Sequence, residues 1–512
     1  MPFKDIKVIP ADQALDNLKS RVQPTFVIDS LRNTLLNRSK PAVTALIEEG
    51  YLDRDYSYSH FMQRGRAFTP SSRRTMRVHF FSSHFTKRRL YKMTPDFQNL
   101  MNDVYLGYSV IRPGDPPTLG RTFIEPPEYI NSQKVFFPAQ ASFESNICGA
   151  VLRKKACPYL SQDHVVLACA TASLWISSTS LSLKGVGITN FTTGEITALA
   201  LSLNRPYGPT IGERGLLIGE MEHALMAMGY DPILSEYPDS EFLLNSSYTY
   251  LESGIPPVAV IDFPANQIDS VTFEGLHALT IIGHVMDTGY RRRVKLYNHT
   301  ISSSDFVPGI ILHDDQNGMY LVANILPAGR TTNPLYKAKL EITVGNNTLT
   351  GYCKTAIFPL PSRVLLQGEI ATSAAISWLQ LFQTLNLLED KQLVVRTFLV
   401  TSNKFKQSLI IRNVPLQLSA IYRGCSLPRF IWIVEYGYAD DWIGKNLGDL
   451  KIQGEFIVDP TSPATKTPSF LIMHLPKMVL SRHVDKYDTI KIRSFDIPND
   501  YPYSPLQDID RP

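Results

Sequence analysis

The sequence predicts an α+β protein, in which a central domain of helices and an antiparallel sheet lies between an N-terminal region of mixed α/β character and a C-terminal β-rich domain. Three observations support this class. Apolar residues recur at steps of three and four in residues 11–49, as they do in amphipathic helices. They alternate with polar residues in residues 74–85, as in a half-buried strand. Beyond residue 335, short runs rich in Val, Ile and aromatic residues follow one another, which is typical of a sheet.

The composition is that of a globular protein, because 44% of the residues are hydrophobic and 19% are charged. A length of 512 residues suits about three domains. The 51 Lys and Arg against 47 Asp and Glu leave a formal charge of +4, which is too small to indicate by itself a nucleic-acid or membrane partner. Five cysteines, odd in number and widely spread, favour a reducing compartment.

The N-terminal residues MPFKDIKVIPADQ carry charges and prolines where a signal peptide requires an unbroken apolar segment. No run of the chain approaches the roughly 18 apolar residues needed to cross a bilayer. We therefore expect a cytoplasmic protein without a membrane partner.

The N-terminal region, residues 1–132, is expected to hold helices broken by Pro24 and Pro41, followed by the strand in residues 74–85. Nine Lys and Arg lie between residues 64 and 92, interleaved with aromatic residues. Such interleaving can bind single-stranded nucleic acid. Solvated Arg side chains on one face of a strand explain it without a ligand, and we favour that interpretation. The proline-rich segment 113–127 indicates a linker, so we place a domain boundary near Ser132.

The stretch from Ser161 to Ser177 runs from a polar segment directly into an apolar helical pattern that carries Cys169. The N-terminal end of a helix behaves as a partial positive charge, which favours a thiolate there. Gln162 lies just upstream, and its side-chain amide can donate to an oxyanion. Cys148 lies in a strand-like context with no helix after it, so we interpret it as a buried structural thiol.

Two later strand patterns carry a histidine and an acidic pair. His277 follows Gly275 at the beginning of one apolar run, and His284 lies seven residues further, so the two histidines face opposite sides of a regular strand. Asp314 and Asp315 end the next such run and are likewise expected to point oppositely. A β-bulge would exchange the two aspartates.

This order of Gln162, Cys-x-x-Ala-x-Leu at Cys169, His277 opening a strand, and Asp-x-x-x-Gly from Asp314 to Gly318 resembles the papain-like cysteine peptidase superfamily. Within it, the order is most similar to the bacteriocin-processing double-glycine peptidases, over residues 162–318. The resemblance implies a papain-like domain in residues 133–330 of a bacterial protein.

In that family pattern, Cys169 is the nucleophile, His277 the general base and acid, Asp314 the residue that orients the imidazole, and Gln162 an oxyanion-hole donor. The resemblance also selects Asp314 over Asp315. Two features depart from the family. Ala170 follows the cysteine where those peptidases usually have Gly, and the Gln-to-Cys interval is seven residues where six is usual.

The other segments add elements without a further catalytic pattern. Thr192 to Glu195 has the spacing of a capping box, and residues 215–230 are typical of a helix that carries His223, a surface or packing residue. Residues 289–306, which include three consecutive arginines at 291–293, form either a substrate-contacting flap or an exposed excursion between strands.

The C-terminal β-rich domain is placed in residues 331–490. It is expected to hold a hairpin turning at Asn346 and Asn347, a helix in residues 368–388, and strands in residues 393–402, 408–414, 429–438 and 454–459. Residues 491–512 are rich in Pro and Asp and are expected to form a flexible tail.

The functional prediction is a cysteine-nucleophile hydrolase that cleaves a peptide or isopeptide bond through an acyl-enzyme formed by Cys169, His277 and Asp314. We expect no metal and no organic cofactor, because the sequence has no Cys-x-x-Cys, no His-Glu-x-x-His and no Gly-rich phosphate loop. The expected partner is a protein or peptide substrate, not nucleic acid, and the oligomeric state is left open. Two alternatives remain: an acyltransferase with the same triad, and an inactive papain-like scaffold that binds a protein partner.

Overall fold

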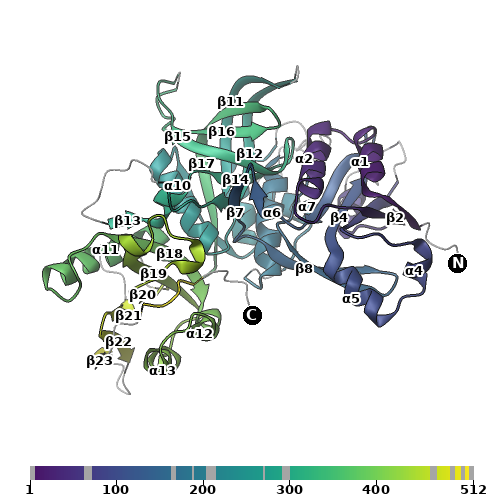
Figure 1. Cartoon of the computed structure of the whole chain (residues 1–512). Helices are drawn as coiled ribbons and strands as arrows, with labels where there is room; N and C mark the ends of the chain where they lie inside the picture. Colours follow the sequence, from purple (N-terminus) through teal and green to yellow (C-terminus); the bar gives the residue numbers. More distant parts are fainter. Residues whose placement is uncertain are drawn as a thin grey trace. The chain divides into compact units, whose positions relative to one another are not determined.

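The computed structural model describes residues 6–62, 68, 72–162, 169–186, 189–202, 215–268, 271–290, 300–331, 333–461, 470–484, 490–496 and 502–506. These residues form a mixture of helices and mostly antiparallel sheets, so the α+β class is confirmed (Figure 1). The chain divides into two compact units. The first comprises Met1–Ser240, Ile255–Gly283 and Ile310–Leu360, and the second comprises Glu241–Gly254, His284–Gly309 and Pro361–Pro512.

The first unit begins with a five-stranded antiparallel sheet whose strands follow one another in chain order. Its strands are β1 (Ile6–Pro10), β2 (Thr44–Tyr51), β3 (Thr75–Phe81), β4 (Tyr105–Arg112) and β5 (Thr118–Ile124). The helices that connect them are α1 (Ala11–Lys19), α2 (Thr25–Leu36), α3 (Arg54–Met62), α4 (Lys87–Tyr91) and α5 (Pro95–Val104).

Two helices and strand β3 confirm the predictions for residues 11–36 and 74–85, but the helix predicted beyond Pro41 is wrong. Residues 44–51 form β2, and Ile47 pairs with Lys7 on one side and Val78 on the other. Pairing with a strand on each side outweighs a short helical period, because local propensity is weak compared with tertiary contacts.

The expectation of solvated basic side chains on β3 is wrong for Arg77, which is 7% exposed. Its Nε donates to Glu48 Oε2 at 2.6 Å. Strand β3 lies inside the sheet and is buried along nearly its whole length, so a cation on it requires a carboxylate partner.

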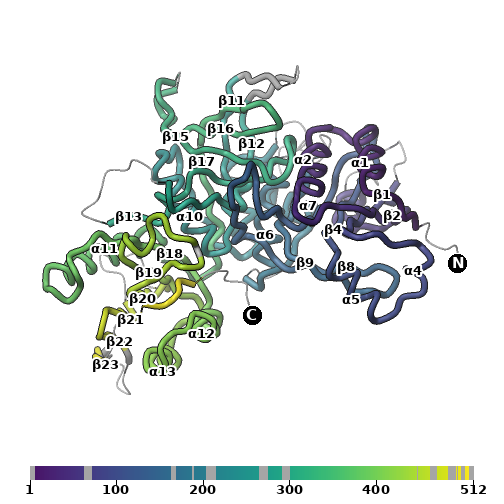
Figure 2. Tube along the Cα trace, viewed as in Figure 1, coloured from purple at the N-terminus to yellow at the C-terminus, as the bar shows by residue number. Residues whose placement is uncertain are grey.

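A second sheet of the first unit closes into a barrel. Six antiparallel strands pair in the closed order β11, β12, β14, β15, β16, β17 and back to β11. The barrel strands are β11 (Val258–Ile268), β12 (Val271–Val285), β14 (Ile310–Asp314), β15 (Gly318–Pro327), β16 (Ala338–Val344) and β17 (Asn347–Pro361). The path of the chain through β11, β12, β15, β16 and β17 can be followed in Figure 2.

Shorter elements complete this unit. Strand β10 (Tyr230–Glu236) extends the sheet from β17, while β7 (Gln133–Phe136) and β6 (Tyr129–Ile130) extend it from β12. Strands β8 (Ala141–Ile147) and β9 (Ala150–Ala156) form a separate hairpin. The remaining helices described are α6 (Cys169–Leu183), α7 (Thr193–Ala200) and α9 (Ile218–Ala227), and Thr192 and Glu195 form the predicted capping box of α7.

The predicted domain boundaries at residues 132 and 330 do not coincide with this division. Residue 132 lies between two paired strands, with Ile130 opposite Gln133. The predicted hairpin is confirmed, although it turns at Gly345 and Asn346, and Asn347 already pairs with Val344. Its strands β16 and β17 belong to the barrel and not to the C-terminal unit. A turn-rich segment indicates a loop, but it does not indicate which sheet the next strand joins.

The second unit is organised around a seven-stranded sheet, in which β13 runs parallel to β18 and the other neighbouring strands pair antiparallel. In spatial order its strands are β13 (Thr300–Ser302), β18 (Leu393–Thr401), β19 (Phe430–Tyr438), β20 (Gly454–Val458), β21 (Phe470–Leu475), β22 (Met478–Val484) and β23 (Ile490–Asp496). Its helices are α10 (Ser240–Glu252), α11 (Gly368–Thr384), α12 (Ser402–Ile411) and α13 (Leu416–Gly424), with 3₁₀ turns η3 (Ser303–Phe306), η4 (Ala439–Asp441) and η5 (Leu447–Asp449).

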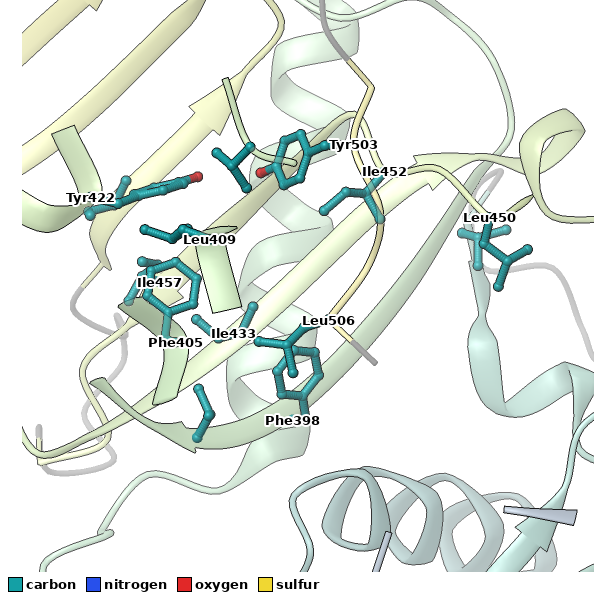
Figure 3. Packing of buried hydrophobic residues seen from close by; sticks show 14 of the residues in the cluster. Phe398, Phe405, Leu409, Tyr422, Ile433, Leu450, Ile452, Ile457, Tyr503 and Leu506 are labelled. Atoms are coloured by element: carbon teal, nitrogen blue, oxygen red, sulfur yellow. The ribbon is translucent and has the colours of Figure 1, made fainter. Parts of the chain in front are cut away.

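The strand predicted in residues 408–414 is wrong, because most of that segment belongs to α12. The Thr401 side chain caps this helix by accepting from the N–H of Lys404. Phe405 and Leu409, four residues apart, point into the core of the unit (Figure 3). A short apolar run fits either a strand or a buried helix face. Here the Thr401 cap favours the helix.

The flexible tail predicted for residues 491–512 is also corrected. Strand β23 pairs with β22, and Tyr503 and Leu506 lie in the hydrophobic core of the second unit (Figure 3). Arg396 Nη1 donates to the carbonyl of Leu506 at 2.6 Å, and the N–H of Leu506 donates to Glu435 Oε1 at 2.6 Å. Composition alone did not reveal these buried partners. Residues 497–501 and 507–512 lie outside the described residues.

Within the part of the chain that the structure describes, no helix is both long enough and apolar enough to cross a membrane.

Replacing Leu506 by Ala should lower the free energy of unfolding by about 2–5 kcal/mol, the usual cost of removing a buried Leu side chain. Leu506 is 3% exposed, whereas Leu416 is 86% exposed and provides the matched control. Leu416→Ala should change the same quantity by less than about 0.5 kcal/mol. Urea unfolding measures both, and equal effects would contradict the packing of the C-terminal segment into this core.

Candidate active site

Cys169 is the first residue of helix α6. Its side chain is half-buried. The next twelve residues, 170–181, are all buried, so the helix is enclosed on all sides. The backbone N–H groups at the start of a helix carry a partial positive charge, so a sulfur at this position lies where a negative charge is stabilised. Residues 163–168, which precede it, lie outside the described residues.

The imidazole of His277 lies between the sulfur and two carboxylates. His277 is on β12 opposite Ile261 of β11, and it is 8% exposed. Its Nε2 lies 2.9 Å from Asp314 Oδ1. The Cys169 sulfur is a second hydrogen-bond partner of the ring. Because Nε2 faces the carboxylates, Nδ1 is the nitrogen left for the sulfur.

The environment of His277 favours the charged imidazolium. Burial alone would lower the pKa of His277, but the charges of Asp314 and Cys169 and their hydrogen bonds raise it well above its ordinary value. A cationic imidazole is a proton donor toward a neighbouring group.

Asp314 ends β14 and is fully buried. Its Oδ1 accepts the backbone N–H groups of Gln316 (2.9 Å) and Asn317 (3.1 Å), and its Oδ2 accepts the Asn317 amide (2.6 Å). Burial raises the pKa of Asp314, but the charge and hydrogen bond of His277, with those of the turn, lower it below its usual range. Gly318 closes this turn with φ +125°, and a side chain there would collide with Ser30.

Asp315 also reaches the imidazole, contrary to the prediction that the two aspartates point oppositely. Its Oδ1 lies 3.4 Å from His277 Nε2. The strand register shifts between Leu312 and Asp314, and this irregularity ends the alternation of faces. Both oxygens of Asp315 are buried without a hydrogen-bond partner among the described residues. Burial raises the pKa of Asp315 to about 7, with His277 opposing and Asp314 reinforcing the change.

The oxyanion role of Gln162 stays a prediction. The residue is 6% exposed, and its backbone carbonyl accepts from Ser161 Oγ at 3.3 Å. No contact of its side chain with Cys169 or His277 is described, and the segment that joins it to the helix lies outside the described residues.

The other residues considered from the sequence lie apart from this site. Cys148 is exposed, not buried, and occupies a two-residue hairpin turn with Gly149, both at positive φ. His223 on α9 contacts Ser202 through Nε2 at 2.9 Å. The His284 ring is 2.7 Å from Glu252 Oε1, within the second unit. The three arginines at 291–293 lie outside the described residues.

Sequence reasoning missed two residues that hold Asp314 in place. Asn317 binds both of its oxygens, and the hydroxyl of Tyr159 donates to its backbone carbonyl at 3.1 Å. The Asp-x-x-Asn spacing is typical of a turn in which the Asp side chain accepts from the backbone, so Asn317 carried a readable signal. Tyr159 is 155 residues away in the chain, and nothing local indicates its role.

One nitrogen of His277 and the carboxylates of Asp314 and Asp315 lie within 4.8 Å of one another, a spacing that suits a divalent cation. The hydrogen bonds argue against this use. Asp314 already accepts from Gln316, Asn317 and the imidazole, so a cation would compete with these donors. A protonated imidazole has no lone pair for a metal, and the raised pKa of His277 favours that form.

The chain matches no protein-family model, and a comparison with curated proteins found no match. Function is therefore inferred from the site itself.

Asp315 should destabilise the folded protein at neutral pH. Its pKa is 3.8 ordinarily and about 7 in the fold. Between these values the unfolded chain has lost the proton and the folded chain keeps it, so stability falls as the pH rises to about 7 and then stays level. Asp315→Asn should raise the free energy of unfolding at pH 8, by at most about 4 kcal/mol at 1.36 kcal/mol per pKa unit, and the gain should shrink toward pH 4.

The matched control is Asp314→Asn, which should lower stability at pH 8 because the pKa of Asp314 is depressed. Denaturant unfolding at several pH values measures both variants. An Asp315→Asn variant that loses as much stability at pH 8 as Asp314→Asn would contradict the assignment.

Proposed function

We propose that this protein is a cysteine-nucleophile hydrolase of the papain-like type, which cleaves a peptide or isopeptide bond in a protein or peptide substrate. One observation carries the proposal: a half-buried sulfur at the start of a helix and a buried carboxylate contact the same imidazole. Papain-like enzymes use a thiol helix packed on a sheet that carries the histidine and its acidic partner. Here Cys169 begins helix α6, His277 lies on β12 and Asp314 ends β14, which supports the proposal.

In the proposed reaction, the His277 imidazole holds on Nδ1 the proton that Cys169 has given up. The sulfur then attacks the carbonyl carbon of the substrate, and a thioester forms as the C–N bond breaks. The imidazolium returns its proton to the leaving amine, and Asp314 holds the ring in place throughout. Water, deprotonated by His277, hydrolyses the thioester, which releases the acid and restores the thiol.

Two donors are proposed for the oxyanion: the backbone N–H of Cys169 and the amide of Gln162. An N–H in the first turn of a helix has no partner within the helix, so it is available to a ligand. An amine in place of water would make the same thioester an acyl-transfer intermediate.

The paired thiol should alkylate faster than an exposed thiol on the same chain. Cys148 is exposed and Cys169 is half-buried, so Cys148 serves as an internal reference. At pH 6, iodoacetamide should modify Cys169 faster than Cys148, because the thiolate is the reactive form. His277→Ala should reduce the Cys169 rate at least about tenfold and leave Cys148 unchanged. Peptide mass spectrometry measures both rates, and a Cys169 that labels more slowly than Cys148 in the wild-type protein would rule out the activated thiol.

Trapping tests the hydrolase itself. Cys169→Ala keeps the site but removes the nucleophile, so it should retain a substrate from a lysate of the source organism. The wild-type protein should cleave the recovered molecule, with a rate at least about a hundredfold above that of His277→Ala. Transfer to an added amine in place of hydrolysis would identify an acyltransferase. A retained protein that neither wild type nor variant changes would favour the scaffold.

A further inference from the structure

Side-chain hydroxyls attach helix α6 to the strand that carries His277. Ser173 lies four residues after Cys169, and residues four apart share one face of a helix. The Ser173 hydroxyl donates to the carbonyl of Ala278, the residue after His277, at 2.9 Å. In the opposite direction, the Thr280 hydroxyl donates to the carbonyl of Ser173 at 3.2 Å. Two reciprocal bonds therefore join α6, one turn from the sulfur, to β12, one to three residues from the imidazole.

Both hydroxyls are shielded from water, since Ser173 is 2% exposed and Thr280 is 0% exposed. Water cannot readily replace a lost partner at such a position, so each bond is a strong restraint on the groups that it joins. The two bonds attach Ser173 to two different residues of the strand, Ala278 and Thr280. Together they oppose sliding of α6 along β12, the motion that would change the separation of the Cys169 sulfur and the His277 ring.

The same helix carries two hydroxyls that form the same kind of bond farther from the sulfur. Ser177 donates to the carbonyl of Pro256 at 2.7 Å, and Ser180 donates to the carbonyl of Ala139 at 2.6 Å. Both are fully buried. They lie about two and three helical turns from Cys169, and neither carbonyl is adjacent to His277. They should contribute to stability as Ser173 does, but not to the geometry of the sulfur and the imidazole.

We propose that Ser173 and Thr280 are positioning residues, whose reciprocal hydrogen bonds hold the Cys169 sulfur at the distance from His277 at which a proton passes between them. The inference rests on the proposed function, because the spacing matters only if sulfur and imidazole act together. A misplacement of about 1 Å in a reacting pair costs about a hundredfold in rate. Hydrogen bonds so close to both groups therefore affect the rate of the reaction more than they affect the stability of the fold.

The test compares Ser173→Ala and Thr280→Val with the matched controls Ser177→Ala and Ser180→Ala, each in the full chain. The rate of Cys169 alkylation by iodoacetamide is measured from pH 5 to 9, together with the melting temperature. Ser173→Ala and Thr280→Val should slow alkylation at pH 6 by about tenfold and move the pH profile toward that of His277→Ala. The controls should lose a similar amount of thermal stability and keep the wild-type profile. Ser173→Thr, which retains a hydroxyl, should restore it.

Profiles that move alike in all four variants, or in none, would overturn the proposal. If Ser173→Ala does not fold, Thr280→Val tests the same contact from the strand. A different result would overturn the proposed function itself. If His277→Ala leaves the pH profile of Cys169 alkylation unchanged, the sulfur and the imidazole do not act as a pair. The two failures are therefore distinguishable.

Discussion

The hydrogen bond between His277 and Asp314 is the interaction on which the rest of the candidate site depends. It joins the barrel strands β12 and β14. The two residues are 37 positions apart in the chain, and both are buried. A buried ion pair is stable only where its remaining polar atoms are also satisfied. The turn after β14 meets this condition, because Gln316 and Asn317 donate to the carboxylate. Closure of the barrel holds the two strands, so the imidazole has a fixed orientation before any substrate binds.

Sequence order was sufficient to select residues that the fold brings together. Cys169 begins a helix and Asp314 ends β14, as the pattern predicted. His277 lies in the middle of β12 and does not open the strand, contrary to the prediction. These signals are local: a polar run before an apolar helix, and apolar runs that end in a turn. The contact between them is not local, and the resemblance to a family order supplied the hypothesis that composition and periodicity alone do not contain.

The sequence did not reveal which strands and which buried side chains would pair with one another. Residues 44–51 have a helical period and form a strand because β1 and β3 flank them. Strands β16 and β17 close the barrel although they lie beyond the domain boundary predicted at residue 330. The buried positions of Arg77 and Leu506 depend on Glu48 and on Arg396, which lie far away in the chain. In each case the contact that determines the structure joins residues far apart in the chain. The periodicity and composition of a segment describe only residues that are close together in the sequence.

Buried polar groups are satisfied by ion pairs at some positions, as at Arg77 in the first unit, and by neutral hydroxyls at others. In the second unit, the charged Arg396 donates to Glu252 and Glu435, so its interior polar atoms are held by ion pairs. In the first unit, α6 uses neutral serine hydroxyls that donate to backbone carbonyls, as Ser173 and Ser177 do. Neutral bonds hold the helix without adding a charge close to Cys169. The field at the sulfur is then set by the groups that take part in the proposed chemistry.

The different environments of Asp314 and Asp315 follow from the distribution of hydrogen-bond donors in one turn. Two carboxylates near one imidazole cannot both ionise without mutual repulsion, so the group with more donors carries the charge. Asp314 accepts from Gln316, Asn317 and His277, whereas neither oxygen of Asp315 has such a partner among the described residues. Asp314 is therefore the ionised residue that orients the ring, and the pKa of Asp315 rises to about 7. Carboxylates whose pKa values are pushed apart by their surroundings take separate roles, and here the backbone of the turn makes that division.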